Sequence, residues 1–98
     1  MAIQVIIKRK VKQGRQAKEL VPFILQMRAC AMYQPGYISG ETLCDTEHPG
    51  DCLVVSRWET IEDWNNWVRN QERAAIDQKI ETLTDEKSEY HIYSPMVP

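Results

Sequence analysis

Two polar side chains on predicted strands could carry acid–base or anion chemistry in this chain of 98 residues. The imidazole of His91 ionises near neutral pH and could act as a general base. Arg57 lies between apolar residues of a strand expected to be central, and its guanidinium could hold an anionic ligand oxygen. Both also have ordinary structural readings: a hydrogen-bonded or solvent-facing histidine, and an arginine paired with Glu41 or Glu59. We carry His91 and Arg57 forward as candidate catalytic residues.

Large apolar side chains could form the wall of a ligand site. Tryptophan and tyrosine rings offer planar surfaces to an aromatic ligand, and methionine fills irregular cavities. The candidate substrate-binding residues are Trp67, Tyr37, Trp64, Phe23 and Met27. Core packing is the alternative for each of them, and we favour it for Trp58 and Trp64.

The cysteines raise the question of a metal site. Cys44, His48 and Cys52 supply three zinc-type ligands, and Asp45 or Asp51 could be a fourth. Structural zinc sites show paired short spacings that are missing here, and a hairpin loop explains the pattern, so we predict no metal. An odd count of three cysteines indicates reduced thiols in a cytosolic protein. Cys44 and Cys52 could meet across the hairpin, but a disulfide is not expected there.

Composition and charge exclude several classes of partner. The net charge is -2, from 12 basic and 14 acidic residues, so nothing draws the chain to nucleic acid or an anionic membrane. The basic run at residues 8–12 is interpreted as a solvated strand end. The apolar N-terminal stretch precedes its charges, unlike a signal peptide, and is too short to span a bilayer. We therefore predict a cytoplasmic protein with no membrane partner.

Periodicity indicates which elements position these residues. Alternating β-branched residues predict strands over 2–11, 37–43, 52–58 and 88–94. Helical spacing predicts a helix over about 15–33, where Pro22 requires either a start near Val21 or a bend. A second helix follows an N-cap at Thr60. Its apolar stripes are rotated by about 120° at 3.6 residues per turn, which predicts a break near Arg69 and Asn70.

The order strand, helix, strand, strand, helix, strand is the ferredoxin-like βαββαβ arrangement of an α+β fold. Right-handed crossovers put the helices on one face of a four-stranded antiparallel sheet. Apolar residues occur on both faces of the strands, and the chain has no further element to cover the second face. We therefore expect residues 1–98 to form a single domain that pairs with a second copy as a homodimer.

Two segments resemble the antibiotic biosynthesis monooxygenase (ABM) family. The stretch QPGYISGETL at residues 34–43 is similar to that family's second strand, and SRWETIEDWNNW at residues 56–67 is similar to its passage from strand to helix. The resemblance implies a dimeric α+β barrel with a pocket between sheet and helices in each subunit. It also implies oxygenation of a small aromatic or quinol-type molecule by molecular oxygen, with no cofactor.

A haem-degrading branch of that family uses an asparagine on the first strand, a tryptophan in the second helix and a histidine ten residues later. Trp67 fits the tryptophan, but Asp77 occupies the histidine's place and residues 2–11 contain no asparagine. Haem binding or degradation is therefore the least favoured function. The first hypothesis is a cofactor-independent monooxygenase, with a non-catalytic small-molecule-binding dimer as the alternative.

Overall fold

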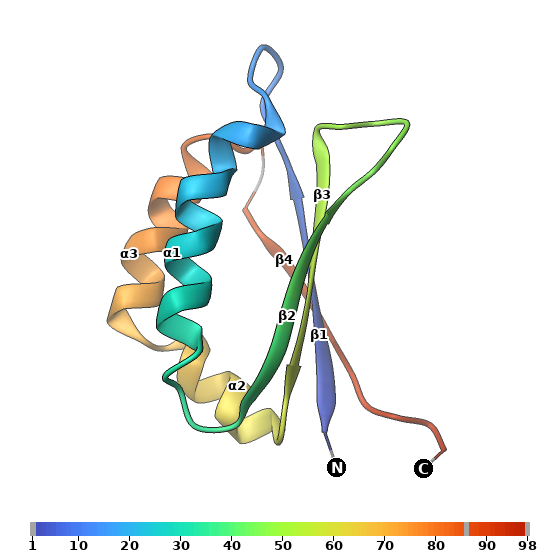
Figure 1. Ribbon diagram of the computed structural model, residues 1–98, viewed down its shortest axis with the longest axis vertical. Coiled ribbons are helices and arrows are strands. Elements are labelled where there is room, and N and C mark those ends of the chain that lie inside the picture. The colour runs from blue at the N-terminus through green and yellow to red at the C-terminus, as the bar shows by residue number, and fades with distance from the viewer. Residues whose placement is uncertain (1, 86, 98) are drawn as a thin grey trace.

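The computed structural model describes residues 2–85 and 87–97. Its elements, in chain order, are β1 (Ile3–Lys10), the 3-10 helix η1 (Ala17–Leu20), α1 (Val21–Ala31), β2 (Tyr37–Cys44), β3 (Asp51–Trp58), α2 (Ile61–Val68), α3 (Gln71–Glu81) and β4 (Glu89–Tyr93). The strands form one antiparallel sheet in the order β2-β3-β1-β4, and the helices lie on one side of it (Figure 1). The predicted ferredoxin-like α+β fold is confirmed.

Alternation along the two central strands, β1 and β3, produces the core. Ile3, Val5 and Ile7 are buried, while their neighbours Gln4 and Lys8 are exposed. On β3, Trp58 and Ser56 are buried and lie directly opposite Ile3 and Val5. Residues directly opposite each other share a face, so one side of the sheet packs against the helices.

The helix ends follow local sequence signals. Pro22 lies in the first turn of α1, which begins at Val21 after the 3-10 turn, so the first of the two alternatives for that proline is confirmed. Thr60 caps α2 by accepting a hydrogen bond from the Asp63 N–H at 3.1 Å. The predicted break near Asn70 is confirmed, because the Asn70 side chain caps α3 there.

One interpretation of the basic run at residues 8–12 is wrong. Lys8, Lys10 and Lys12 are exposed, but Arg9 points to the helix side and is only 7% exposed. Strand alternation puts it on the same face as Ile7, and the guanidinium finds a carboxylate there. The run is therefore a strand end with one inward cation.

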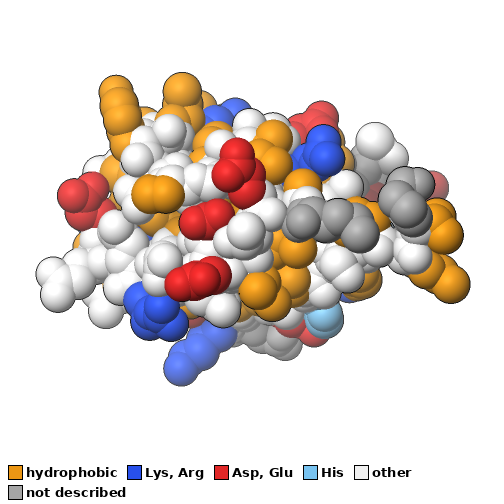
Figure 2. Space-filling view, turned by 90° about the horizontal axis from the view of Figure 1, so that it is seen from below, with side chains coloured by type: hydrophobic (Ala, Val, Ile, Leu, Met, Phe, Trp, Pro, Cys, Tyr) orange, Lys and Arg blue, Asp and Glu red, His pale blue; other side chains and the backbone are white. Residues whose placement is uncertain are grey.

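The surface at the α2 end is mixed in character. Figure 2 shows acidic side chains gathered near the middle of this view, with apolar side chains between and beside them. The first turn of α2 carries Glu62 and Asp63, which the positive end of the helix dipole favours. Within the described residues, none of the helices is long and apolar enough to cross a bilayer.

Candidate functional site

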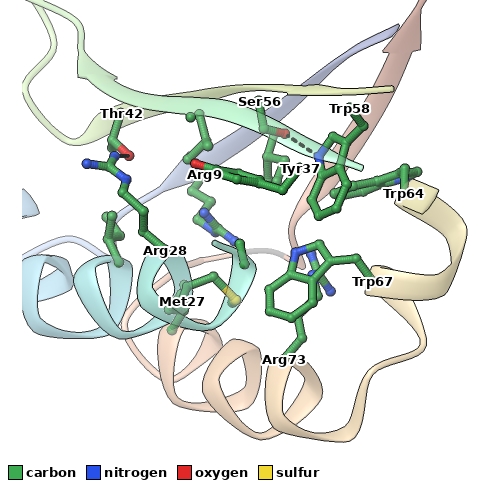
Figure 3. A pocket seen from close by; sticks show the side chains of 16 residues that line it. Arg9, Met27, Arg28, Tyr37, Thr42, Ser56, Trp58, Trp64, Trp67 and Arg73 are labelled. Atoms are coloured by element: carbon green, nitrogen blue, oxygen red, sulfur yellow. Dashed lines mark hydrogen bonds between the residues drawn. The ribbon is translucent and has the colours of Figure 1, made fainter. Parts of the chain in front are cut away.

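A cavity of about 60 Å³ lies between the helices and the inner face of the sheet (Figure 3). The side chains that line it come from α1, β2, β3, α2, α3 and β1. Its aromatic and sulfur-bearing members are Tyr37, Trp58, Trp64, Trp67 and Met27, and its polar members are Arg9, Arg28, Thr42, Ser56 and Arg73. This volume is well below the ~150 Å³ of an apolar cavity that binds benzene, so side chains must move before an aromatic ring can enter.

Aromatic rings form one end of the cavity. Trp58 lies at the centre of this group: it stacks on Trp67 with centroids 6.3 Å apart and meets Trp64 and Tyr37 edge-on at 5.9 and 5.3 Å. The Trp58 indole N–H donates to Ser56 Oγ at 3.2 Å, which fixes the central ring. These packed rings therefore form an aromatic wall against which the ring of a ligand can pack.

A buried charged network adjoins these aromatic rings. Arg9 lies 3.4 Å from Asp77 and also donates from Nε to Ser88 Oγ at 3.2 Å. Arg73 donates to the Tyr90 hydroxyl at 2.7 Å, and that hydroxyl lies 3.4 Å from the second oxygen of Asp77. The Arg73 guanidinium carbon also lies over the rings of Trp64 and Tyr90, 5.5 and 5.1 Å from their centroids. The network thus connects β1, α3 and β4.

Among the described residues of this network, the charges do not balance. The guanidinium of Arg9 lies beside the Asp77 carboxylate, and that of Arg73 reaches this carboxylate only through the Tyr90 hydroxyl, which leaves one positive charge in excess. Burial lowers the pKa of Arg9 from its ordinary value; Asp77 opposes that change, and the nearby positive charge of Arg73 adds to it. Both arginines line the cavity, so an anion bound there would relieve the excess charge.

Arg28 spans the side of the cavity between α1 and β2. Its guanidinium donates to Thr42 Oγ1 at 3.3 Å, as its place between the two elements in Figure 3 illustrates. Both residues line the cavity. A single hydrogen bond between flexible side chains is weak, so this side can open with little loss of free energy.

The structure separates the sequence-predicted site residues into two groups. Trp67, Tyr37, Trp64 and Met27 line the cavity together, whereas Phe23 packs in the neighbouring apolar cluster. Trp58 and Trp64, for which we favoured core packing, belong to the buried core and also line the cavity.

His91 and Arg57 lie on the other face of the sheet. His91 is directly opposite Ile6, and Arg57 is directly opposite Gln4, both on the face of β1 that the helices do not cover. The His91 Nε2 atom is 3.0 Å from Glu89 Oε1, an ion-pair contact when the imidazole is protonated but not a hydrogen bond by geometry. Neither residue lines the cavity. Their catalytic roles stay predictions.

Sequence reasoning missed Arg9 and Arg73 as site residues. Arg73 precedes Ile76 and Ile80 by three and seven positions, so helical spacing places it on the buried stripe of α3. The helical spacing could have identified Arg73 as a buried residue. The alternation along β1 could likewise have identified Arg9, because it puts Arg9 on the same face as Ile7.

The hairpin between β2 and β3 brings Asp45, His48 and Asp51 together, with ligand atoms within 4.8 Å of one another. All three are exposed, and Asp45 Oδ1 accepts hydrogen bonds from the backbone of Glu47 and His48. Those bonds lower the pKa of Asp45 and account for its position. Neither cysteine of the hairpin joins the group, so we propose no metal there.

The chain matches one protein-family model and is similar to several solved structures. A model of the antibiotic biosynthesis monooxygenase family matches residues 2–79. SnoaB, a cofactor-independent oxygenase from Streptomyces nogalater, is 11% identical with a TM-score of 0.86, covering 99% of this chain and 95% of that chain. A conserved protein from Methanosarcina mazei Go1 is 19% identical, with a TM-score of 0.85 and coverage of 95% and 91%. Likeness at these identities shows the fold alone. No curated protein matches the sequence.

Proposed function

Because this chain belongs to the antibiotic biosynthesis monooxygenase family, we propose that it is a cofactor-independent monooxygenase that binds a small aromatic or quinol-type substrate as its anion. The observation that best supports the proposal is the unbalanced charge of Arg9 and Arg73 beside an aromatic wall. A planar phenolate or enolate fits both surfaces: its ring meets the tryptophans and its oxygen meets a guanidinium.

The chemistry then begins with an ionised substrate. Among the described residues, neither a carboxylate nor a histidine lines the cavity, so the arginines act by stabilising the anion and lowering the substrate's pKa. The anion is electron-rich and transfers electrons to molecular oxygen. Where the oxidised carbon is a CH2 group, as in an anthrone, one oxygen atom ends on this carbon as a carbonyl, and the other leaves as water with the two hydrogens that the carbon loses. The substrate thus supplies all four electrons.

Oxygen uptake with a panel of anthrones and dihydroxyaromatics tests this proposal. We expect uptake by the unmodified protein and its loss in Arg73→Gln. Binding of an unreactive phenolate should weaken about 10–100-fold in that variant, as expected for a lost hydrogen bond between charged groups. Affinity for a neutral aromatic of the same shape should hardly change.

Arg69→Gln is the matched control, because Arg69 is an exposed arginine at the end of the neighbouring helix. It should leave uptake unchanged. His91→Ala tests the sequence-predicted base separately: unchanged uptake removes that role, and lost uptake would transfer the chemistry to the other face of the sheet. Equal weakening of anionic and neutral ligands in Arg73→Gln would contradict anion binding.

A non-catalytic small-molecule-binding dimer is the second candidate. The observation that favours it is the small cavity without an acid or base among its described lining residues. Here a phenolate should raise the melting temperature while oxygen consumption stays at the background rate. Haem binding is not proposed, because Asp77 stands where the haem-degrading branch has its histidine, and this aspartate pairs with Arg9. We propose further that residues 1–98 form one domain that acts as a cytoplasmic homodimer.

A further inference from the structure

Two cysteines lie directly opposite each other on β2 and β3. Cys44 and Cys52 are register partners, and their sulfur atoms are 3.5 Å apart, both as free thiols. The Asp45 N–H donates to Asp51 O at 2.9 Å, so the adjacent pair is the hydrogen-bonded one. The cysteines therefore occupy a non-hydrogen-bonded position, where opposite side chains approach most closely. The Cα separation of about 4.5 Å at such positions falls within the range for disulfides.

The two thiols differ in their surroundings. Cys44 is exposed, whereas Cys52 is 6% exposed and packs with the apolar cluster around Leu20 and Ile80. Burial, followed by the contact with Cys44, raises the pKa of the Cys52 thiol to about 12. Cys44 is therefore the thiol that a dissolved oxidant can reach, and Cys52 is close enough to react with the oxidised Cys44 sulfur.

We propose that Cys44 and Cys52 form an oxidation site at which a hydroperoxide produces a reversible disulfide within one chain. The Cys44 sulfur attacks one peroxide oxygen; an S–O bond forms, the O–O bond breaks, and the leaving oxygen departs as water. The Cys52 sulfur then attacks the Cys44 sulfur, forming the S–S bond and releasing the second oxygen as water. Two thiols and hydrogen peroxide thus give a disulfide and two waters. Cytosolic disulfides are typically transient bonds of this kind.

The cysteine pair lies next to residues that line the cavity. Thr42 and Val54 are the next inward pair along the same two strands, and both line the cavity. A disulfide would join the edge strand β2 covalently to β3, next to the part of the cavity that Thr42 and Val54 line. This inference rests on the sulfur geometry and does not depend on the proposed oxygenase activity.

Thiol titration under denaturing conditions tests it without any substrate. The reduced protein, freed of reductant, is treated with one equivalent of hydrogen peroxide. We expect titratable thiols to fall from the three in the sequence to one, with the intact chain lighter by two hydrogens. Dithiothreitol should restore all three. Peptide mapping should identify a bond between Cys44 and Cys52.

Two variants separate this pair from other oxidation. Cys30→Ser keeps the pair, so both of its remaining thiols should disappear without forming a covalent bond between two chains. Cys44→Ser changes an exposed residue and should keep both of its remaining thiols. Retention of all three thiols by the unmodified protein would overturn the proposal. So would a covalent dimer on a non-reducing gel, or a product heavier by two oxygens.

Discussion

Arg9, Arg73 and Asp77 show how single residues combine structural and functional demands. The guanidinium of Arg9 is desolvated, with its side chain only 4% exposed, and Asp77 is the carboxylate that offsets this burial. Removing one partner of a buried pair leaves the other charge without compensation, which costs more than the pair contributes. The network is therefore a liability for stability that a bound anion would reduce.

Asp77→Asn should lower the free energy of unfolding by roughly 3 kcal/mol, because it keeps the shape of the side chain and removes the charge that faces Arg9. Urea denaturation followed by tryptophan fluorescence measures the change. Arg9→Met in the Asp77→Asn background removes the uncompensated cation and should recover most of the loss. A single-variant loss below 0.5 kcal/mol or so, typical of a surface pair, would contradict the importance of this pair.

At the same scale, the sequence was informative about residue type but not about partners. Trp64, Trp67 and Met27 were identified as candidate wall residues because large aromatic and sulfur-bearing side chains suit the apolar lining of a ligand site. Arg9 was missed because three exposed lysines surround it in sequence, and only its inward direction distinguishes it. His91 and Arg57 were singled out by their chemistry, but strand parity puts them on the face away from the cavity.

The α2 helix depends on its connection to the loop before β2. Gly36 has φ of +83° and lies against the Asp63 side chain, and Asp63 also accepts a hydrogen bond from the Thr60 hydroxyl at 2.8 Å. The start of α2 and the turn after α1 are thus in contact through one side chain. Trp64 and Trp67 follow directly in α2, so this junction sets the position of the aromatic wall.

Gly36→Ala should destabilise the fold more than Gly14→Ala. Both glycines have left-handed backbones, so each substitution costs about 1–2 kcal/mol. A Cβ at Gly36 would also overlap with Asp63, which adds about 1–3 kcal/mol, whereas a Cβ at Gly14 meets nothing within 4 Å. Thermal and urea unfolding of the two variants measure the difference.

Asp63→Gly provides the control for this comparison, because the Asp63 Cβ itself lies 2.6 Å from the position of the new methyl group. The overlap disappears in that background, so Gly36→Ala should then cost no more than Gly14→Ala. Equal losses in the two single variants would show that the turn relaxes around the new methyl group.

Element order and the break between α2 and α3 were predictable because both depend on local signals. Turn residues and strand alternation mark the boundaries, and two apolar stripes on different sides of one helix cannot face the same sheet. The 3-10 turn before α1 was not predicted, since Ala17 and Leu20 match helical spacing equally well in either form.

At the scale of the whole molecule, the sheet has one covered face and one without a helix (Figure 1). Ile6, Leu53 and Val55 alternate with the buried set on the two central strands, so they point to the uncovered face. Apolar side chains on a central strand favour a partner surface there. Two copies packed through this face would form the barrel that the family resemblance implies.

Val55→Glu should therefore convert a dimer into a monomer, because it puts a charge at the centre of that face. Sedimentation velocity at several concentrations measures the change. Ala75→Glu adds the same charge to an exposed position on α3 and should leave the sedimentation coefficient unchanged. A monomeric unmodified protein, or a Val55→Glu variant that sediments as a dimer, would refute an interface through the sheet.

The hydrogen bond between Arg28 and Thr42 has a further consequence for ligand choice. One wall of the cavity is joined there by side chains, which rotate in nanoseconds, while the tryptophan wall is held by packing. The cavity can therefore widen at the side of Arg28 and Thr42, while the tryptophan wall stays in place. It should accept ligands of different length, but it should discriminate strongly between planar and non-planar ligands and between anionic and neutral ones. Chemically related anions of several sizes should therefore compete for the same place, and relatives with altered specificity should differ first at Arg28 and Thr42.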